Sequence, residues 1–156
     1  MQAIVAMSEN RAIGLKGGLP WPKNAADLKW FKNFTIGKNL AFGSKTFKTL
    51  PTLNNRHVAV LTNCNWGSFG ATGNQENWSV HYVNNKNLIT DDYIICGGAS
   101  IYSLFLPQID EFFVTQIKGV FVADTFMPDF EHLFAKREKW AILEDKETEV
   151  WKYSKV

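Results

Sequence analysis

Residues 14–34 read GLKGGLPWPKNAADLKWFKNF, and the rest of the chain is organised around this stretch. Its first half holds three glycines and two prolines, which predicts a surface loop rather than a helix or a central strand. In its second half Asp27, Trp30, Phe31 and Phe34 stand at i, i+3, i+4 and i+7. This spacing places a carboxylate on one helix face together with three aromatic rings.

Asp27 allows two interpretations. A carboxylate in the first turn of a helix is stabilised by the helix dipole, by roughly 0.3–1 kcal/mol. Burying an ionised carboxylate among aromatic rings instead costs several kcal/mol, so the site either protonates the acid or supplies a donor-rich partner. The preceding loop, with its glycines and with Leu19 and Trp21, has the composition of a mobile lid that excludes water from a pocket. The loop therefore favours a binding site.

The composition is that of an ordinary globular chain, and we expect a single domain over residues 1–156. A net charge of +2 is too small to indicate nucleic-acid binding. The apolar stretch 3–7 is too short for a signal peptide or a membrane span, so we predict a cytoplasmic protein with no membrane partner. Cys64 and Cys96 lack metal-ligand spacing and are expected to be reduced, and no metal site is expected.

Short apolar runs alternate with helical segments along most of the chain. This pattern predicts an α/β fold, a single-domain three-layer arrangement with a mixed, mainly parallel eight-stranded sheet, about four flanking helices and an antiparallel C-terminal hairpin at the sheet edge. Residues 63–77 are rich in Asn and Gly and are expected to form a loop. The strands are predicted at 2–7, 39–42, 57–62, 79–83, 93–96, 111–117, 140–146 and 149–154, and the helices at 25–36, 44–49, 86–90 and 100–105.

Two junctions have the order strand, glycine, helix: residues 42–46 (FGSKT) and residues 96–100 (CGGAS). Ser44 is expected to cap the helix that follows the first junction. Either junction alone is typical of a tight turn, and neither matches the dinucleotide fingerprint or the P-loop. Together they predict two helix N-termini at the carboxyl end of one sheet, where a pyrophosphate-bearing cofactor binds in open α/β folds.

An ordered set of residues covering most of the chain resembles the dihydrofolate reductase family. The resemblance implies NADPH-dependent reduction of 7,8-dihydrofolate to 5,6,7,8-tetrahydrofolate for one-carbon metabolism, with hydride transfer from nicotinamide C4 to pterin C6 and protonation at N5. It also implies a monomer that binds dihydrofolate and antifolate-type small molecules. The matching residues are Ala6, Ile13-Gly14, Leu19-Pro20-Trp21, Ala26-Asp27-Leu28, Trp30-Phe31-Lys32, Gly43, Lys45-Thr46, Arg56, Gly97-Gly98, Tyr102, Thr115 and Asp124-Thr125.

The resemblance also implies roles for the substrate residues. Asp27 would accept two parallel hydrogen bonds from the 2-amino and N3 edge of the pterin and would act electrostatically, while water delivers the proton to N5. Thr115 would orient that carboxylate, Arg56 would pair with the α-carboxylate of the glutamate tail, and Phe31 would pack on the rings. The implied catalytic residues are Asp27, Trp21, Leu19 and Thr115. The implied substrate contacts are Ile4, Ala6, Asp27, Leu28, Phe31, Lys32, Leu53, Arg56 and Thr115.

For the cofactor, the resemblance implies a non-proline cis peptide at Gly97-Gly98 against the phosphates, and Tyr102 at the edge of the nicotinamide. The implied NADPH contacts are Ala6, Ile13, Gly14, Gly18, Leu19, Gly43, Ser44, Lys45, Thr46, Leu61, Thr62, Asn63, Cys96, Gly97, Gly98, Ala99, Ser100, Ile101, Tyr102 and Thr125.

The sequence also departs from the family pattern. Many members carry an arginine where this chain has Ser44, which leaves Lys45 and Asn63 as candidates for gripping the 2′-phosphate of NADPH. Leu19 replaces a methionine that is common in bacterial members, and the lid is one residue longer between Trp21 and Asp27. Residues 63–77 have no family counterpart, and the C-terminal hairpin is short.

Two other functions share the predicted fold. A pyrimidine reductase of riboflavin synthesis would use the same cofactor type, but it does not need a pterin-binding carboxylate such as Asp27. A non-catalytic folate- or nucleotide-binding or structural protein is the second alternative. It is disfavoured because every position that the chemistry needs is filled.

Overall fold

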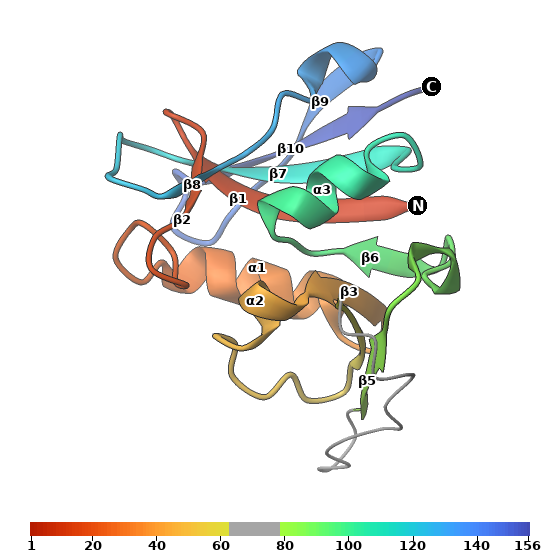
Figure 1. Ribbon diagram of the computed structural model, residues 1–156. Coiled ribbons are helices and arrows are strands. Elements are labelled where there is room, and N and C mark those ends of the chain that lie inside the picture. The colour runs from red at the N-terminus through yellow and green to blue at the C-terminus, as the bar shows by residue number, and fades with distance from the viewer. Residues whose placement is uncertain (63–78) are drawn as a thin grey trace.

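The computed structural model describes residues 1–62 and 79–156, so the predictions for the 63–77 loop, Asn63 and Cys64 lie outside the described residues. One large sheet is flanked by helices (Figure 1). In chain order the elements are β1 (Gln2–Ser8), β2 (Ala12–Gly14), α1 (Ala25–Thr35), β3 (Asn39–Gly43), α2 (Ser44–Phe47), β4 (His57–Leu61), β5 (Ser79–Val83), the 3-10 turn η1 (Lys86–Leu88), β6 (Tyr93–Ile95), α3 (Ala99–Phe105), β7 (Glu111–Ile117), β8 (Thr125–Phe126), the 3-10 turn η2 (Glu131–Leu133), β9 (Lys136–Ile142) and β10 (Glu149–Ser154).

The large sheet has eight strands in the order β5-β4-β3-β6-β1-β7-β10-β9. The strands from β5 to β7 all pair in parallel. β10 then joins β7 antiparallel, and β9 joins β10 antiparallel. The prediction of a mixed, mainly parallel sheet with a C-terminal hairpin at its edge is therefore confirmed. Because the central strands are parallel, their carboxyl ends meet at one edge of the sheet.

Two apolar cores lie on opposite faces of the sheet, because successive side chains of a strand point to opposite faces. Ala3 and Ile95 pack with Phe105 of α3 on one face. Ile4 packs with Ala26 of α1 on the other face, where Phe47 of α2 also contacts the core. The three-layer prediction is confirmed. The described residues hold three α-helices and two 3-10 turns.

α1 forms where the aromatic spacing predicts it. Asn24 is the N-cap, and its Oδ1 accepts the backbone N–H of Asp27 at 3.0 Å. The helix ends at Thr35, and Gly37 follows with φ of +73°, a left-handed conformation that favours glycine. Sequence reasoning missed the Asn24 cap, although an Asn three residues ahead of an acid is a capping signal.

The first strand of the C-terminal hairpin is displaced from its predicted position. β9 spans Lys136–Ile142, whereas the prediction was 140–146. Residues 143–148 form the turn, in which Asp145 Oδ1 accepts the backbone N–H groups of Glu147 and Thr148 at 3.1 and 2.9 Å. Nearly every β9 side chain is exposed, so the strand has no buried face to produce the alternation on which the prediction relied.

Two short segments form a second sheet that was not predicted. β2 and β8 pair antiparallel, with Ala12 opposite Phe126 and Gly14 opposite Thr125. Both strands are too short to show periodicity. This sheet ties the start of the lid to the chain that follows β7.

No helix in the described ranges is long and apolar enough to cross a lipid bilayer.

Candidate active site

Asp27 is buried at the start of α1, with 7% of its surface exposed. Burial removes water from the carboxylate and raises the pKa of Asp27 from 3.8 to about 6, and the nearby Thr115 hydroxyl partly opposes this shift. Asp27 is also in the first turn of the helix, where the dipole favours a negative charge. Both interpretations of this residue hold, and burial has the larger effect on its pKa.

Thr115 lies on β7 opposite Ala6 of β1 and is completely buried. Its hydroxyl favours the ionised form of Asp27, yet among the described residues it makes no hydrogen bond of normal length and angle. A buried hydroxyl without a full partner costs about 1–3 kcal/mol. The Asp27 and Thr115 pair therefore keeps unused hydrogen-bonding capacity for a ligand.

The aromatic stripe of α1 packs against the sheet. The rings of Trp30 and Phe34 lie 5.4 Å apart, and Phe34 lies 4.7 Å from Phe113 of β7. Phe31 remains partly exposed, and Leu28 is 42% exposed. Trp30 and Phe34 thus anchor the helix, while Phe31 of the stripe stays partly exposed and Leu28, outside the stripe, is exposed.

Arg56 is buried. Its Nε donates to the backbone oxygen of Asn54 at 2.8 Å, and its Nη1 donates to Thr35 Oγ1 at 3.2 Å. Thr35 Oγ1 donates in turn to the Phe31 backbone oxygen at 2.7 Å. Sequence reasoning missed Thr35, because a threonine in a last helical turn carries no signal that it will orient an arginine.

The two glycine junctions meet at the carboxyl edge of the sheet. The backbone N–H of Gly43 donates to the Gly97 oxygen at 2.8 Å, and the Gly97-Gly98 peptide is cis, as the family resemblance implied. A Cβ at Gly43 would lie 2.9 Å from Ile101 Cγ1, and a Cβ at Gly98 would lie 2.8 Å from Thr46 Oγ1. Glycine is therefore needed here for close approach.

The N-cap of α2 is Gly43, so the prediction that Ser44 caps this helix is wrong. Gly98 is the N-cap of α3, and neither cap makes a side-chain hydrogen bond within the described residues. In α3 the Ile101 N–H already donates to the Gly98 oxygen at 3.0 Å, so the Ala99 and Ser100 N–H groups, together with the first turn of α2, are the candidate donors to an external acceptor. This donor set fits the phosphates of a dinucleotide.

Tyr102 links α3, which follows the double glycine, to β1. Its hydroxyl donates to the Ile4 backbone oxygen at 2.6 Å, and the side chain is 3% exposed. Burial raises the pKa of the Tyr102 phenol well above its usual value, and the negative charge of Asp27 adds to that shift. Tyr102 also lies close to the double glycine, where a Cβ at Gly97 would be 3.3 Å from the Tyr102 oxygen.

The lid begins with a tight turn. Leu15 and Gly18 exchange backbone hydrogen bonds at 2.9 Å, while Lys16 and Gly17 have φ of +50° and +81°. The Lys16 N–H donates to Asp124 Oδ2 at 2.9 Å. Leu19 is 47% exposed, whereas Trp21 is 6% exposed and packs edge-on against Phe121 at 6.0 Å.

The other predicted site residues occupy three kinds of environment. Ile4, Leu53 and Ile101 are buried in the two cores. Lys32, Lys45, Gly18 and Ser100 are exposed. The partly exposed residues are Ala6, Ile13, Gly14, Leu61, Thr62, Cys96, Ala99 and Thr125.

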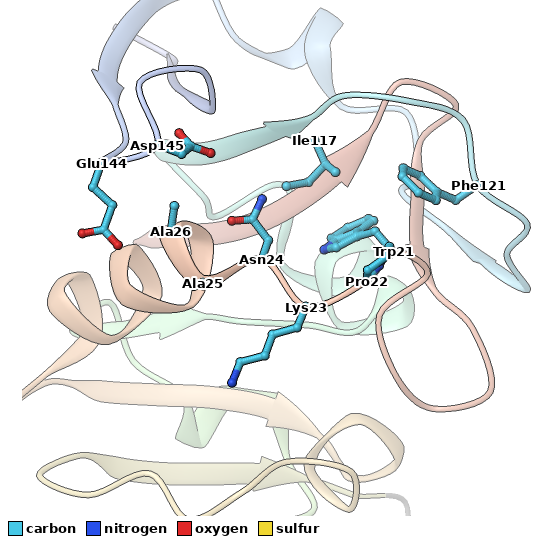
Figure 2. A pocket seen from close by; sticks show the side chains of 10 residues that line it. All are labelled: Trp21, Pro22, Lys23, Asn24, Ala25, Ala26, Ile117, Phe121, Glu144 and Asp145. Carbon is cyan, nitrogen blue, oxygen red and sulfur yellow. The ribbon is translucent and has the colours of Figure 1, made fainter.

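A cavity of about 680 Å³ lies beside the lid (Figure 2). Asp27 does not line it, so it is distinct from the immediate surroundings of the buried carboxylate. Its lining residues are Trp21, Pro22, Lys23, Asn24, Ala25, Ala26, Ile117, Phe121, Glu144 and Asp145.

Comparisons with known proteins agree on one family. Residues 1–155 match the family model described as dihydrofolate reductase. The dihydrofolate reductase of Buchnera aphidicola subsp. Baizongia pistaciae is 34% identical over 139 residues, which cover 83% of this chain and 78% of the relative. That of Haemophilus influenzae is 30% identical over 142 residues, covering 89% and 82%. A structure of dihydrofolate reductase from Enterococcus faecalis, complexed with NADP(H) and RAB-propyl, has a TM-score of 0.75 at 27% identity and covers 98% of this chain and 94% of that one.

Proposed function

The chain belongs to the dihydrofolate reductase family and reduces 7,8-dihydrofolate to 5,6,7,8-tetrahydrofolate with NADPH, and we propose that Asp27 is the residue on which its substrate binding and turnover depend. The hydride comes from C4 of the reduced nicotinamide and goes to C6 of the pterin, while N5 gains a proton. The observation that carries the proposal is the burial of Asp27 beside Thr115, with hydrogen-bonding capacity left over.

Asp27 would accept the 2-amino and N3 hydrogens of the pterin through two parallel charge-assisted hydrogen bonds. These donors would replace the water that burial removes from the carboxylate, and Thr115 would orient it. The negative charge would also favour protonation at N5, with water as the proton source. Asp27 acts in this scheme as an anchor and an electrostatic stabiliser.

Arg56 would bind the α-carboxylate of the glutamate tail. Its Nε and Nη1 are held by Asn54 and Thr35, which fixes the plane of the guanidinium and leaves Nη2 for an external carboxylate. Phe31 and Leu28 would pack against the rings of the substrate, since both remain accessible on the same helix. Lys32 would assist at the exposed end of the tail.

The cofactor phosphates would bind at the first turns of α2 and α3, where Gly43 and Gly98 allow close approach to the backbone. Tyr102 would border the nicotinamide beside Gly97. Lys45, which is exposed, would contact the 2′-phosphate in place of the arginine that many relatives carry next to Gly43. The lid, including Leu19 and Trp21, would exclude water from the reacting atoms.

A steady-state assay tests the role of Asp27. The parent should oxidise NADPH when dihydrofolate is added, and Asp27→Asn should lose most of this activity near neutral pH because the amide cannot carry the negative charge. The effect should appear in kcat as well as in KM, since the charge acts in the transition state. Full turnover by the variant would refute the role of Asp27 while leaving the family assignment intact.

Thr115→Val is the matched comparison, because it removes only the hydroxyl that orients the carboxylate. It should retain more activity than Asp27→Asn. A diaminopyrimidine antifolate supplies an independent readout: its protonated ring needs an anionic partner, so Asp27→Asn should weaken its binding far more than Thr115→Val does.

We further propose one domain over residues 1–156, a monomer in solution and a cytoplasmic location. The single eight-stranded sheet, into which both the first and the last strands are built, supports the one-domain proposal. The free thiol of Cys96 is compatible with a reducing compartment. Light scattering at a mass near 17.7 kDa tests the oligomeric state, and cell fractionation tests the location.

A further inference from the structure

Two histidines lie side by side on the outer part of the large sheet. The chain has three histidines, and the rings of His57 and His81 are in contact. His81 belongs to β5, the outermost described strand at its end of the sheet (Figure 1). Neither ring belongs to the candidate active site. The sequence did not indicate this pair, because it forms only when β4 and β5 align.

The parallel register of β4 and β5 puts both rings on one face of the sheet. His57 is opposite Ser79, and His81 is opposite Ala59. Side chains two residues apart on a strand point to the same face, so His57 and His81 project from that face as diagonal neighbours. Both side chains are partly exposed, which leaves them within reach of water and dissolved ions.

The separation of the two rings fits a shared metal ion. Their centroids lie 4.7 Å apart, and their planes meet at 32°. A ring nitrogen lies about 1.1 Å from its centroid, and its bond to zinc measures about 2.0–2.1 Å. Two imidazoles that bind one ion at an angle of about 90–110° therefore hold their centroids about 4.4–5.2 Å apart. The observed separation falls inside this range.

The Ser79 hydroxyl orients the His57 ring. Its Oγ forms a hydrogen bond with Nδ1 of His57. When the ring donates this bond, Nε2 keeps its lone pair for an ion, and metal-binding histidines are commonly oriented by such a partner on the other nitrogen. The His81 ring has no hydrogen-bonding partner within residues 1–62 and 79–156, so its nitrogens compete with no other contact there.

The surroundings of the pair suit a cation. Burial and the neighbouring His57 both lower the pKa of His81, which keeps a lone pair available near pH 7. The pKa of Asp92 is lowered mainly by hydrogen bonds with Thr90 and Asn39. The positive charge that His57 can carry lowers the pKa of Asp92 further, so this carboxylate acts on the same part of the surface. Its negative charge offsets part of the charge of a bound ion.

Two imidazoles select the kind of ion. Neutral imidazole suits zinc, copper and nickel, whereas calcium and magnesium take oxygen ligands. No group of three or more metal-ligating side chains gathers among the described residues, so water would complete the coordination sphere. A site with two protein ligands binds more weakly than a closed site with four, and we expect a dissociation constant of about 10 µM.

We propose that His57 and His81 bind one divalent transition-metal ion, with one nitrogen from each ring and water in the remaining positions. The ion joins the edge strand β5 to β4. The site is separate from the cofactor site, because His57 is the first residue of β4 whereas the cofactor residues lie at the carboxyl ends of the strands. Loss of the metal site would leave the reductase assignment intact.

Isothermal titration calorimetry of the untagged full chain with zinc chloride tests the proposal. The parent should bind one zinc ion per chain. His81→Asn leaves a single imidazole at the site and should bind zinc at least about tenfold more weakly. His132→Asn is the matched control and should bind as the parent does, since His132 is exposed and lies beside Asp129 on another element. Turnover of dihydrofolate by both variants should equal that of the parent, which shows that they fold.

A second pair of variants tests the orienting role of Ser79. Ser79→Ala removes the hydrogen bond to His57 Nδ1 and should weaken zinc binding about tenfold, whereas Ser79→Thr keeps a hydroxyl and should restore it. Equal affinity of these two variants would contradict that role.

Nuclear magnetic resonance of the imidazole groups locates the bound ion. Zinc should shift the ring resonances of His57 and His81 together and leave those of His132 unchanged. Absence of zinc binding by the parent, full binding by His81→Asn, or a shift at His132 alone would overturn the proposal.

Discussion

At the scale of single residues, Asp27 places function and stability in conflict. Burial raises its pKa to about 6, so the native protein holds this proton more tightly than the unfolded chain does. Stability from this group is therefore fully present below about pH 4 and is lost as the pH rises through about 6. Without a ligand, the ionised carboxylate is a cost that the folded protein carries at neutral pH.

Asp27→Asn should therefore stabilise the ligand-free protein at neutral pH. The shift of about two pKa units corresponds to about 3 kcal/mol, an upper figure because asparagine is also a buried polar group. Denaturant unfolding should show a gain above about pH 6 that disappears near pH 4. Asp91→Asn, at an exposed position, should change stability by less than about 0.5 kcal/mol. A variant less stable than the parent at neutral pH would contradict this account.

Arg56 offers a second test at the residue scale. Arg56→Lys keeps the charge but loses the planar guanidinium group, whose Nε and Nη1 donate to Asn54 and Thr35. KM for dihydrofolate should rise roughly tenfold with little change in kcat, because the tail is bound equally in the ground and transition states. Thr35→Val removes only the hydroxyl that accepts a hydrogen bond from Arg56 Nη1, so it should raise KM by less. An unchanged KM for Arg56→Lys would show that the tail binds elsewhere.

At the scale of elements, the contact between the two glycine junctions controls how closely β3, α2 and α3 approach. Gly43 has φ of −74° and ψ of 154°, angles that any residue adopts, so its requirement for glycine comes only from Ile101. In the lid, by contrast, the requirement for glycine comes from the backbone angles. Gly17 needs its positive φ, and a Cβ there would also lie 2.9 Å from Thr49 Cγ2 near the end of α2.

Gly43→Ala should weaken NADPH binding by roughly tenfold or more, because the new Cβ displaces α3 from the first junction. Ile101→Ala removes the clashing atom, so the double variant should bind NADPH better than Gly43→Ala alone. Isothermal titration calorimetry on the four proteins of this double-mutant cycle measures the coupling. Strict additivity of the two changes would exclude the steric explanation.

The elements also show what the sequence could predict. α1 and the parallel strands have strong local signals, namely helical periodicity and buried apolar runs. Each glycine junction alone is typical of a tight turn, and only the two together indicate a cofactor site. β9 has no local signal, because an exposed edge strand buries no face, and β2 and β8 are too short for any pattern. For the site, the burial of Asp27 was predicted as one of two alternatives. The fixing of Arg56 by Thr35 was not predicted, because it depends on two segments that meet only in the folded chain.

For the whole molecule, cofactor binding should appear as stability, since ligands that bind only the folded state stabilise it. NADPH at a hundredfold excess over its dissociation constant adds about 2.7 kcal/mol, which should raise the melting temperature by about 5 °C or more. NADH at the same concentration should raise it less, and Lys45→Gln should reduce that difference. Equal increases in melting temperature with NADPH and NADH in the parent would show that Lys45 does not bind the 2′-phosphate.

The outermost strand of the sheet has a consequence for behaviour at high concentration. Among the described residues β9 has a neighbouring strand on one side only, so a row of its backbone donors and acceptors lies at the sheet edge, which in principle invites a strand from another molecule. Four charged side chains in succession, from Lys136 to Lys139, occupy its first half. Three of the four are cationic, so a second copy of this edge would bring one net positive segment against another, and crowded molecules are discouraged from pairing at the place where fibril growth would otherwise begin.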